Sequence, residues 1–180
     1  MILGIDTGYA GAVAMISDED CSSYAIPLCK DSDGSKDYDY KVLLDLFKSV
    51  KDAVELVFIE RTFPTPFLHG KASWSLGYGF GSLRSIARAV FGFDKVKTVS
   101  VGEWQKAVFT GYKRETRLYR GDSKPRRERT KDLAVRVIKD VFPDKDWMSE
   151  SRGKISIHDG KVDAYLIAEY GRRKSSGMLI

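Results

Sequence analysis

Five apolar runs of strand length lie in the first hundred residues: Ile2–Ile5, Ala12–Ile16, Ser22–Ile26, Leu56–Ile59 and Val96–Val101. Tight polar turns join the first three runs, and this pattern predicts an antiparallel meander. The fourth run, Leu56–Ile59, is wholly apolar, which is typical of a strand buried on both faces of a sheet. The first half of the chain therefore predicts a five-stranded sheet.

Helical periodicity fills most of the intervals between and after these runs. Tyr40–Val50 has apolar residues at positions 40, 43, 44, 47 and 50, which is the spacing of one helix face. Further helices are predicted over Ser73–Phe91, Glu103–Val108, Thr130–Phe142 and Gly160–Arg172. Polar segments are predicted as loops at 30–39, 61–71 and 144–154.

Helices connect the first, fourth and fifth strands, so we expect these strands to run parallel, with the meander at one edge. The predicted fold class is therefore α/β: a mixed five-stranded sheet flanked by helices. The 180 residues, 43% of them apolar, fit a single domain over residues 1–180. No apolar run approaches the ~20 residues of a membrane span, and the first residues lack a signal-peptide pattern. Cys21 and Cys29 are expected to be reduced thiols.

The charge is unevenly distributed. The whole chain carries +5, whereas residues 111–131 hold nine Lys and Arg against three Asp and Glu, a net +6. A dense basic segment on an otherwise nearly neutral domain favours a polyanionic partner such as nucleic acid. The alternative is a solvated loop that keeps the protein soluble. The cations expected to contact phosphates are Lys124, Arg126, Arg127, Arg129 and Lys131.

Acidic residues stand where two strands end: Asp6 after the first and Glu60 after the fourth. Ligands of open α/β sheets bind at the carboxyl ends of parallel strands, and acids on neighbouring strands lie ~5 Å apart. Asp159 and Asp163, four residues apart, share one face of the last helix. Clustered carboxylates suit Mg²⁺ or Mn²⁺. Each acid also has a structural interpretation, such as Asp159 as a helix N-cap.

Three motifs contain these acids: Ile5-Asp6-Thr7-Gly8, Phe58-Ile59-Glu60-Arg61 and His158-Asp159-Gly160-Lys161-Val162-Asp163-Ala164. With the order of strands and helices, they resemble the RuvC-like Holliday junction resolvases of the ribonuclease H-like superfamily. The resemblance covers nearly the whole chain and is strongest to the phage and chloroplast branch. It implies a ribonuclease H-like fold in which Asp6, Glu60 and Asp163 are catalytic metal ligands.

The chain departs from the bacterial pattern at one position. Three residues before the final acid, where that pattern has an acid or histidine, this chain has Gly160. Asp159 or His158 then replaces the missing ligand. We expect Asp159, because it lies one turn before Asp163, with the two side chains roughly 6 Å apart. His158 is the second choice, as a group that assists at the water or the scissile phosphate.

The resemblance also implies a reaction. Four-way DNA junctions would be resolved by paired symmetric nicks that leave a 5′ phosphate and a 3′ hydroxyl. Two Mg²⁺ ions per site, with Mn²⁺ able to substitute, activate water and stabilise the leaving oxygen. The two-fold symmetry of a junction implies a homodimer, with the glycine-bearing helix Ser73–Phe91 as the expected interface. The expected location is the cytoplasm of a bacterium or phage-infected cell, or an organelle.

The loop after Glu60 holds further expected DNA contacts, namely Phe63, Phe67, His69 and Lys71. Phe63 is expected to stack on unpaired bases, and the alternative is a core residue beneath the loop. A nuclease of the same fold that cuts flaps, forks or RNA hybrids is the main rival. An actin-like kinase or ATPase needs two lobes, for which 180 residues are too few. A non-catalytic DNA-binding module would not need the three acids.

Overall fold

The computed structural model describes residues 1–62, 70–143, 147–151 and 154–178. Its central sheet is built from β1 (Ile2–Asp6), β2 (Ala12–Ile16), β3 (Cys21–Ala25), β6 (Leu56–Arg61) and β7 (Val96–Ser100). The helices are α1 (Tyr40–Val50), the short 3₁₀ turn Lys51–Ala53, α2 (Gly70–Phe91), α3 (Val101–Val108), α4 (Thr130–Val141) and α5 (Asp159–Ser175). Three small hairpins complete the chain: β4 (Leu28–Lys30) with β5 (Lys36–Tyr38), β8 (Thr116–Arg117) with β9 (Arg126–Arg127), and β10 (Met148–Ser151) with β11 (Lys154–Ile157).

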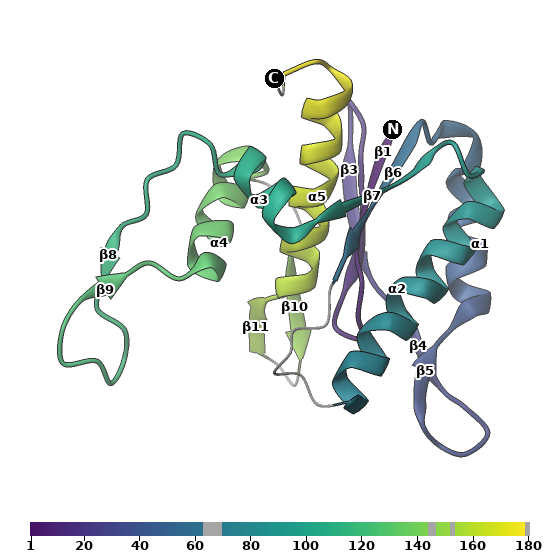
Figure 1. The fold of residues 1–180 in the computed structure, drawn as a ribbon, viewed down its shortest axis with the longest axis horizontal. Helices are drawn as coiled ribbons and strands as arrows, with labels where there is room; N and C mark the ends of the chain where they lie inside the picture. The colour runs from purple at the N-terminus through teal and green to yellow at the C-terminus, as the bar shows by residue number, and fades with distance from the viewer. Residues whose placement is uncertain (63–69, 144–146, 152–153, 179–180) are drawn as a thin grey trace.

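The strand order of the sheet is β3-β2-β1-β6-β7 (Figure 1). The pairs β1–β2 and β2–β3 are antiparallel, whereas β1–β6 and β6–β7 are parallel. This arrangement confirms the predicted meander, the predicted parallel strands and the α/β class. A mixed five-stranded sheet in this order, flanked by helices, is a ribonuclease H-like fold.

Helices cover both faces of the sheet, because alternate residues of each strand are apolar on alternate faces. In β2, Val13 and Met15 pack into one hydrophobic cluster, with residues of α1 and α2. Ala12, Ala14 and Ile16 pack into the other, with residues of α3, α4 and α5. In Figure 1 these two groups of helices lie on opposite sides of the strands.

α5 lies unusually close to the sheet. A Cβ on Gly4 of β1 would meet the backbone of Ala164 and Ala168, and a Cβ on Gly171 would meet the Phe58 ring. Small residues at these contacts allow the helix and β1 to approach at backbone distance. α5 is buried along most of its length as a result. This contact fixes the position of Asp163 relative to the strand that ends in Asp6.

Two segments predicted as loops contain short hairpins. The β4–β5 hairpin overlaps residues 30–39, and the β10–β11 hairpin overlaps residues 144–154. These strands have only three or four residues, so they lack the apolar alternation by which longer strands are recognised. α1 has the predicted bounds, whereas α2 begins earlier than predicted, at Gly70, and α5 extends further, to Ser175. Among the described residues, no helix is long and apolar enough to cross a membrane.

Candidate active site

Asp6 and Glu60 lie side by side at one edge of the sheet. β1 and β6 are parallel, and Ile5 pairs with Ile59, so the acid that follows each residue emerges at the same level. Glu60 is 7% exposed, and Asp6 is half-buried. The prediction that these two strands are adjacent, and that the acids at their ends are therefore neighbours, is confirmed.

Two residues outside the predicted site hold Glu60 in place. The Trp104 indole Nε1 donates to Glu60 Oε2 at 2.8 Å, and the Thr7 hydroxyl donates to the Glu60 backbone carbonyl at 3.4 Å. Trp104 comes from α3 and is almost fully buried. A buried indole N–H requires an acceptor, and α3 follows directly on the strand beside β6. These two considerations could have placed Trp104 beside Glu60 from the sequence alone. The sequence interpretation did not include Trp104 in the site.

His158, not Asp159, is the N-cap of α5. Its Nδ1 accepts a hydrogen bond from the Lys161 backbone N–H at 3.1 Å, whereas Asp159 is the first helical residue. The structural interpretation of Asp159 as N-cap was therefore wrong. Asp159 is exposed, and Asp163, one turn later, is half-buried. Both acids lie at the N-terminal end of α5, where the helix dipole favours negative charge.

Gly160 is the site of the departure from the bacterial pattern, and the fold requires glycine there. A Cβ at this position would meet the carbonyl oxygen of Ala10 and the backbone of Gly11. The first turn of α5 therefore lies directly on the turn between β1 and β2. A ligand side chain at position 160 has no room in this arrangement, so a substitute must come from a neighbouring position.

The acids act on one another electrostatically. Burial, followed by the charges of Glu60, Asp163 and Asp159, raises the pKa of Asp6 to about 8. Burial, followed by Glu60 and Asp159, raises the pKa of Asp163 to about 7, and Lys131 opposes this shift. Burial also raises the pKa of Glu60, against the hydrogen bond from Trp104. Carboxyl groups from β1, β6 and α5 thus share one partly buried space.

Lys131, one of the phosphate contacts predicted for the basic segment, lies beside the candidate acids. It is in the first turn of α4, and its ammonium pairs with the Asp159 carboxylate. The pairing raises the pKa of Lys131. Its positive charge also lowers the pKa of Asp163, so Lys131 partly offsets the negative charge of the acids.

The donor set suits a hard divalent cation. Asp6 and Asp163 make no hydrogen bond or ion pair with any described residue, so their oxygens are available as ligands. Carboxylate oxygens are the groups that Mg²⁺ and Mn²⁺ prefer. As they stand, no three His, Cys, Asp or Glu side chains of the described residues are close enough together to hold an ion between them. Mutual repulsion of the carboxylates opposes a tighter arrangement.

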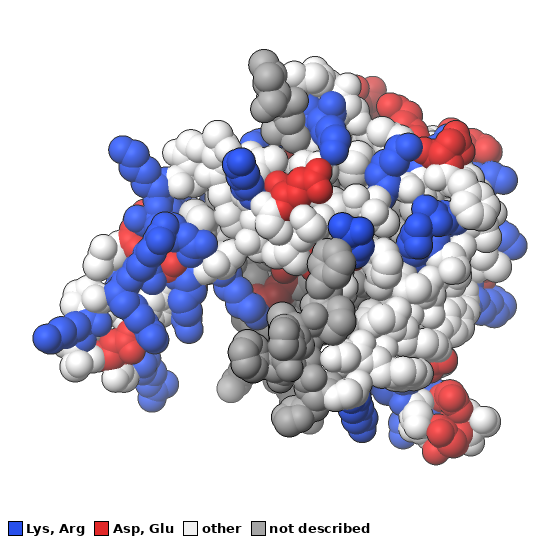
Figure 2. All heavy atoms as spheres, viewed as in Figure 1, with Lys and Arg blue, Asp and Glu red and all other residues white. Residues whose placement is uncertain are grey.

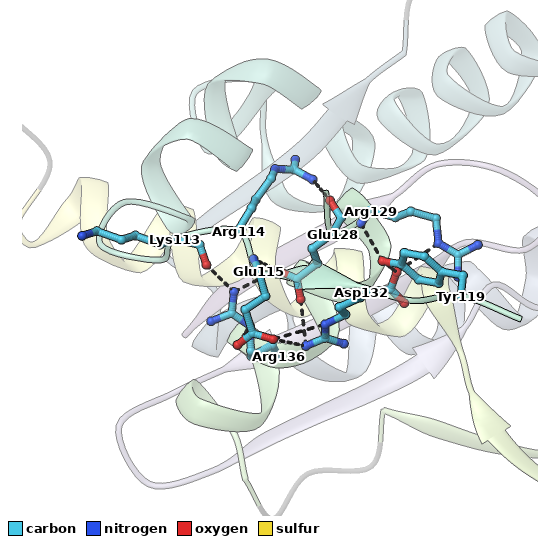
Figure 3. Close-up of polar contacts among 9 residues, drawn as sticks. Lys113, Arg114, Glu115, Tyr119, Glu128, Arg129, Asp132 and Arg136 are labelled. Atoms are coloured by element: carbon cyan, nitrogen blue, oxygen red, sulfur yellow. Dashed lines mark hydrogen bonds and ion pairs between the residues drawn. The ribbon is translucent and has the colours of Figure 1, made fainter. Parts of the chain in front are cut away.

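A basic arm, defined here as residues 111–129, connects α3 to α4 and includes the β8–β9 hairpin. It extends to one side of the sheet and helices in Figure 1, and Lys and Arg side chains cover it in Figure 2. A network centred on Glu128 holds its base (Figure 3). The Glu128 side chain has no exposed surface, and it pairs with Arg117 and with Arg136 of α4, each at 2.9 Å.

A second contact closes the arm on α4. The Arg129 guanidinium lies 4.0 Å from the centre of the Tyr119 ring, and the Tyr119 hydroxyl donates to Asp132 at 2.7 Å. Arg129 also pairs with Asp132 at 3.0 Å. The arm is therefore a structured element and not the simple solvated loop that was the alternative interpretation of its charge.

Ion pairing divides the cations of the arm into two groups. Arg126 pairs with Asp122 at 2.8 Å and Arg129 with Asp132, although both arginines keep more than half of their side chain exposed. In the described part of the chain no side chain pairs with Arg120, Lys124 or Arg127. Arg120 was not among the predicted contacts, because the sequence does not show which cations are already neutralised.

The remaining predicted contacts lie in the segment after Glu60. Phe63, Phe67 and His69 fall outside the described residues. Lys71 is exposed in the first turn of α2. It lines a cavity with Tyr9 and Trp74, not with the candidate acids.

No family model matches the chain. No curated protein sequence matches it either. Among solved structures, the chain is similar to a structure of RuvC from Thermus thermophilus, with a TM-score of 0.49 and 11% sequence identity. The similarity covers 97% of this chain and 96% of that chain, and it is a likeness of overall architecture only.

Proposed function

We propose that this protein is a divalent-cation-dependent endonuclease that resolves four-way DNA junctions. The observation that carries the proposal is the electrostatic coupling of Asp6 and Asp163 with Glu60, because the charge of Glu60 raises the pKa of both acids at the carboxyl ends of β1 and β6. Buried like charges without paired cations are costly to maintain, and such groups are typical of functional sites. The basic arm supports a polyanionic substrate.

Each acid has a distinct part in the proposed site. Asp6 and Asp163 offer carboxylate oxygens with no other partner among the described residues, while Trp104 orients Glu60 through one oxygen and leaves the other available. Asp159 is the proposed fourth ligand, because Gly160 has no side chain and Asp159 precedes Asp163 by one turn. Bound Mg²⁺, or Mn²⁺ in its place, would supply an activated water and stabilise the leaving 3′ oxygen.

Lys131 and His158 lie at the margin of this site. Lys131 neutralises Asp159 in the metal-free chain, and its exposed ammonium is available to a substrate phosphate once Asp159 has another counterion. The N-cap hydrogen bond occupies Nδ1 of His158, so only Nε2 of this ring remains for the reaction. These contacts favour Asp159 over His158 as the metal ligand, since an oxygen ligand also suits Mg²⁺ better.

A homodimer is part of the proposal, because two matched cuts across a junction need two sites related by two-fold symmetry. α2 is the proposed interface. Gly70, Gly77 and Gly81 lie along one exposed side of this helix, and a Cβ on any of them would meet nothing within 4 Å. Among the described residues, these glycines therefore serve no close contact. A monomer in light scattering, both free and on DNA, would contradict this part.

The test compares substrates and variants. Wild-type protein with Mg²⁺ should nick a mobile four-way junction at symmetric positions and cut a flap, a fork and an RNA–DNA hybrid of matched length more slowly. Preference for one of those three would replace the junction with that substrate. Asp6→Asn and Glu60→Gln should each lower the cutting rate by about 100-fold or more, since loss of a metal ligand removes several kcal/mol.

The matched control is Asp45→Asn, because Asp45 is an exposed acid in α1 that pairs with the exposed Lys41. It should cut at the wild-type rate. Junction binding in a mobility-shift assay without metal should be the same for all four proteins. Equal loss of binding and cutting in Asp6→Asn would contradict the assignment.

A further inference from the structure

One tryptophan of this chain is exposed although the other two are buried. Trp74, in the second turn of α2, is 64% exposed, whereas Trp104 and Trp147 are 1% and 4% exposed. Its indole lies flat on the Tyr78 ring, with ring centres 4.9 Å apart and an angle of 9° between the planes. An exposed aromatic pair held parallel is a surface on which a further planar ring can stack.

A chain of hydrogen bonds fixes the Tyr78 ring of this pair. The Tyr78 hydroxyl donates to Asp37 Oδ1 at 2.9 Å and lies 2.6 Å from the Tyr40 hydroxyl, which also contacts the Ser82 hydroxyl at 3.2 Å. These partners come from β5, α1 and α2, so the ring cannot turn without breaking contacts to separate elements. Because the Tyr78 ring is already held in place, a ligand that stacks against the pair loses little free energy to ordering it.

The pair forms one wall of a cavity of about 540 Å³, within the ~300–1,000 Å³ range of small-ligand sites. Tyr9 forms another wall, and the β4–β5 hairpin supplies polar groups around the opening: Asp31, Asp33, Ser35, Lys36 and Asp37. Figure 1 shows this hairpin beside the first turns of α2. Tyr9 follows Asp6 by three residues, so the cavity opens near the same edge of the sheet as the catalytic acids.

We infer that this cavity receives an unpaired nucleobase of the DNA substrate. The inference rests on the proposed action on DNA and names a contact outside the carboxylate site. The Trp74–Tyr78 pair supplies the stacking surface, which accepts any base because every base has a π face. The aspartates at the opening are acceptors for base amino groups. Lys36, whose Nζ lies 5.4 Å from the centre of the Tyr9 ring, and Lys71 can approach the attached phosphate.

The lining distinguishes this cavity from a protein-docking surface. Five of its side chains carry charge, three of them acidic and two basic, and three aromatic rings share the lining with them. The centres of protein interfaces are instead depleted in charged residues. A planar ligand with polar edges and one negative charge matches the cavity better than an apolar side chain of another protein.

Tryptophan fluorescence tests the inference without any cutting, because Trp74 is the exposed tryptophan. The probe is a short single-stranded oligonucleotide, added to the full chain in EDTA, with the fully paired duplex of the same sequence as its comparison. The single strand should quench the emission and the duplex should not. Anisotropy of the labelled strand should show about 10-fold weaker binding for Trp74→Ala than for wild type, and near-wild-type binding for Trp74→Phe.

The control is Phe93→Ala, since Phe93 is 74% exposed in the turn between α2 and β7. It should bind the strand like wild type. Wild-type affinity in Trp74→Ala, or equal quenching by duplex and single strand, would overturn the inference. Trp74 lies on the same side of α2 as Gly70, Gly77 and Gly81, beside the proposed interface. A change from dimer to monomer in Trp74→Ala would assign the ring to that interface and overturn the inference.

Junction cutting by the same variants separates this inference from the proposed function. Quenching by the single strand, without cutting of any substrate by the wild type, would retain the cavity and refute the nuclease. Normal cutting by the wild type, with wild-type strand affinity in Trp74→Ala, would retain the nuclease and refute the cavity.

Discussion

The two charged regions of this molecule are organised in opposite ways. In the carboxylate site, acidic side chains from three elements lie in one partly buried region. Lys131 pairs with Asp159, the most exposed of these acids. In the basic arm, acids such as Glu128 lie among the arginines and hold the segment in shape. Unbalanced charge in a packed region indicates a ligand that supplies the opposite charge, whereas balanced charge in an extended segment indicates structure.

The largest effect is expected where the site depends on close backbone packing. Gly160→Ala should lower the free energy of unfolding by about 1–3 kcal/mol or more, because the new methyl group meets the backbone of Ala10 and Gly11. Gly102→Ala, at an exposed position of α3, is the control, since a Cβ there meets nothing among the described residues and alanine favours a helix by up to ~1 kcal/mol. Urea denaturation of both variants measures the difference. Equal stability of the two would refute the packing argument.

An intermediate effect, confined to the arm, is expected from Glu128→Gln. The amide removes the buried carboxylate that Arg117 and Arg136 share, and both then keep only the more exposed Glu115 carboxylate as a partner among the described residues. Hydrogen bonds to charged groups contribute about 1.5–3 kcal/mol. Limited proteolysis should cut within residues 115–128 faster than in wild type, while the thermal midpoint of the body changes little. The control Glu19→Gln, at an exposed acid between β2 and β3, should leave the proteolysis pattern unchanged. An unchanged pattern in Glu128→Gln would show that the network does not hold the arm.

The smallest effects separate paired from unpaired cations of the arm. Lys124→Ala and Arg127→Ala should each reduce the slope of log K against log salt for junction binding by about 1. Arg129→Ala should reduce it less, because that guanidinium already pairs with Asp132. Fluorescence anisotropy over a range of salt concentrations measures the slopes. Identical slopes for the three variants would mean that these surface ion pairs open on binding.

The sequence predicted the sheet and the candidate acids because both depend on short-range patterns. Apolar runs define β1, β2 and β6, and a run that ends in an acid places that acid at a strand terminus. The neighbourhood of Asp6 and Glu60 followed from topology, since helical connections require parallel strands.

What the sequence did not predict depends on contacts between distant residues. The Trp104–Glu60 hydrogen bond joins residues 44 positions apart, and the Lys131–Asp159 pair joins residues 28 apart. The short hairpin β4–β5 lacks a pattern because local turn hydrogen bonds, not burial, set its shape. Likewise, nothing in the basic segment reveals which arginines Glu128 already neutralises.

The pH dependence of stability follows from the raised pKa values of Asp6 and Asp163, about 8 and about 7 against an ordinary 3.8. Between the ordinary pKa of 3.8 and these raised values, the folded chain binds more protons than the unfolded chain. Stability of the metal-free protein is therefore highest at low pH with respect to these groups and is lost as pH rises from about 4 to about 8. Thermal midpoints across this range should fall in wild type and fall less in Asp6→Asn.

Calorimetric titration of the metal-free protein with Mn²⁺, at about pH 6 and about pH 8.5, tests most directly whether these carboxylates form a cation site. Because the ligands must lose protons, wild type should bind more tightly at the higher pH and release protons at the lower one. Asp6→Asn should lose most of the binding at both pH values, while the control Asp45→Asn should match wild type. Binding of equal affinity in wild type and Asp6→Asn, without proton release, would contradict the account.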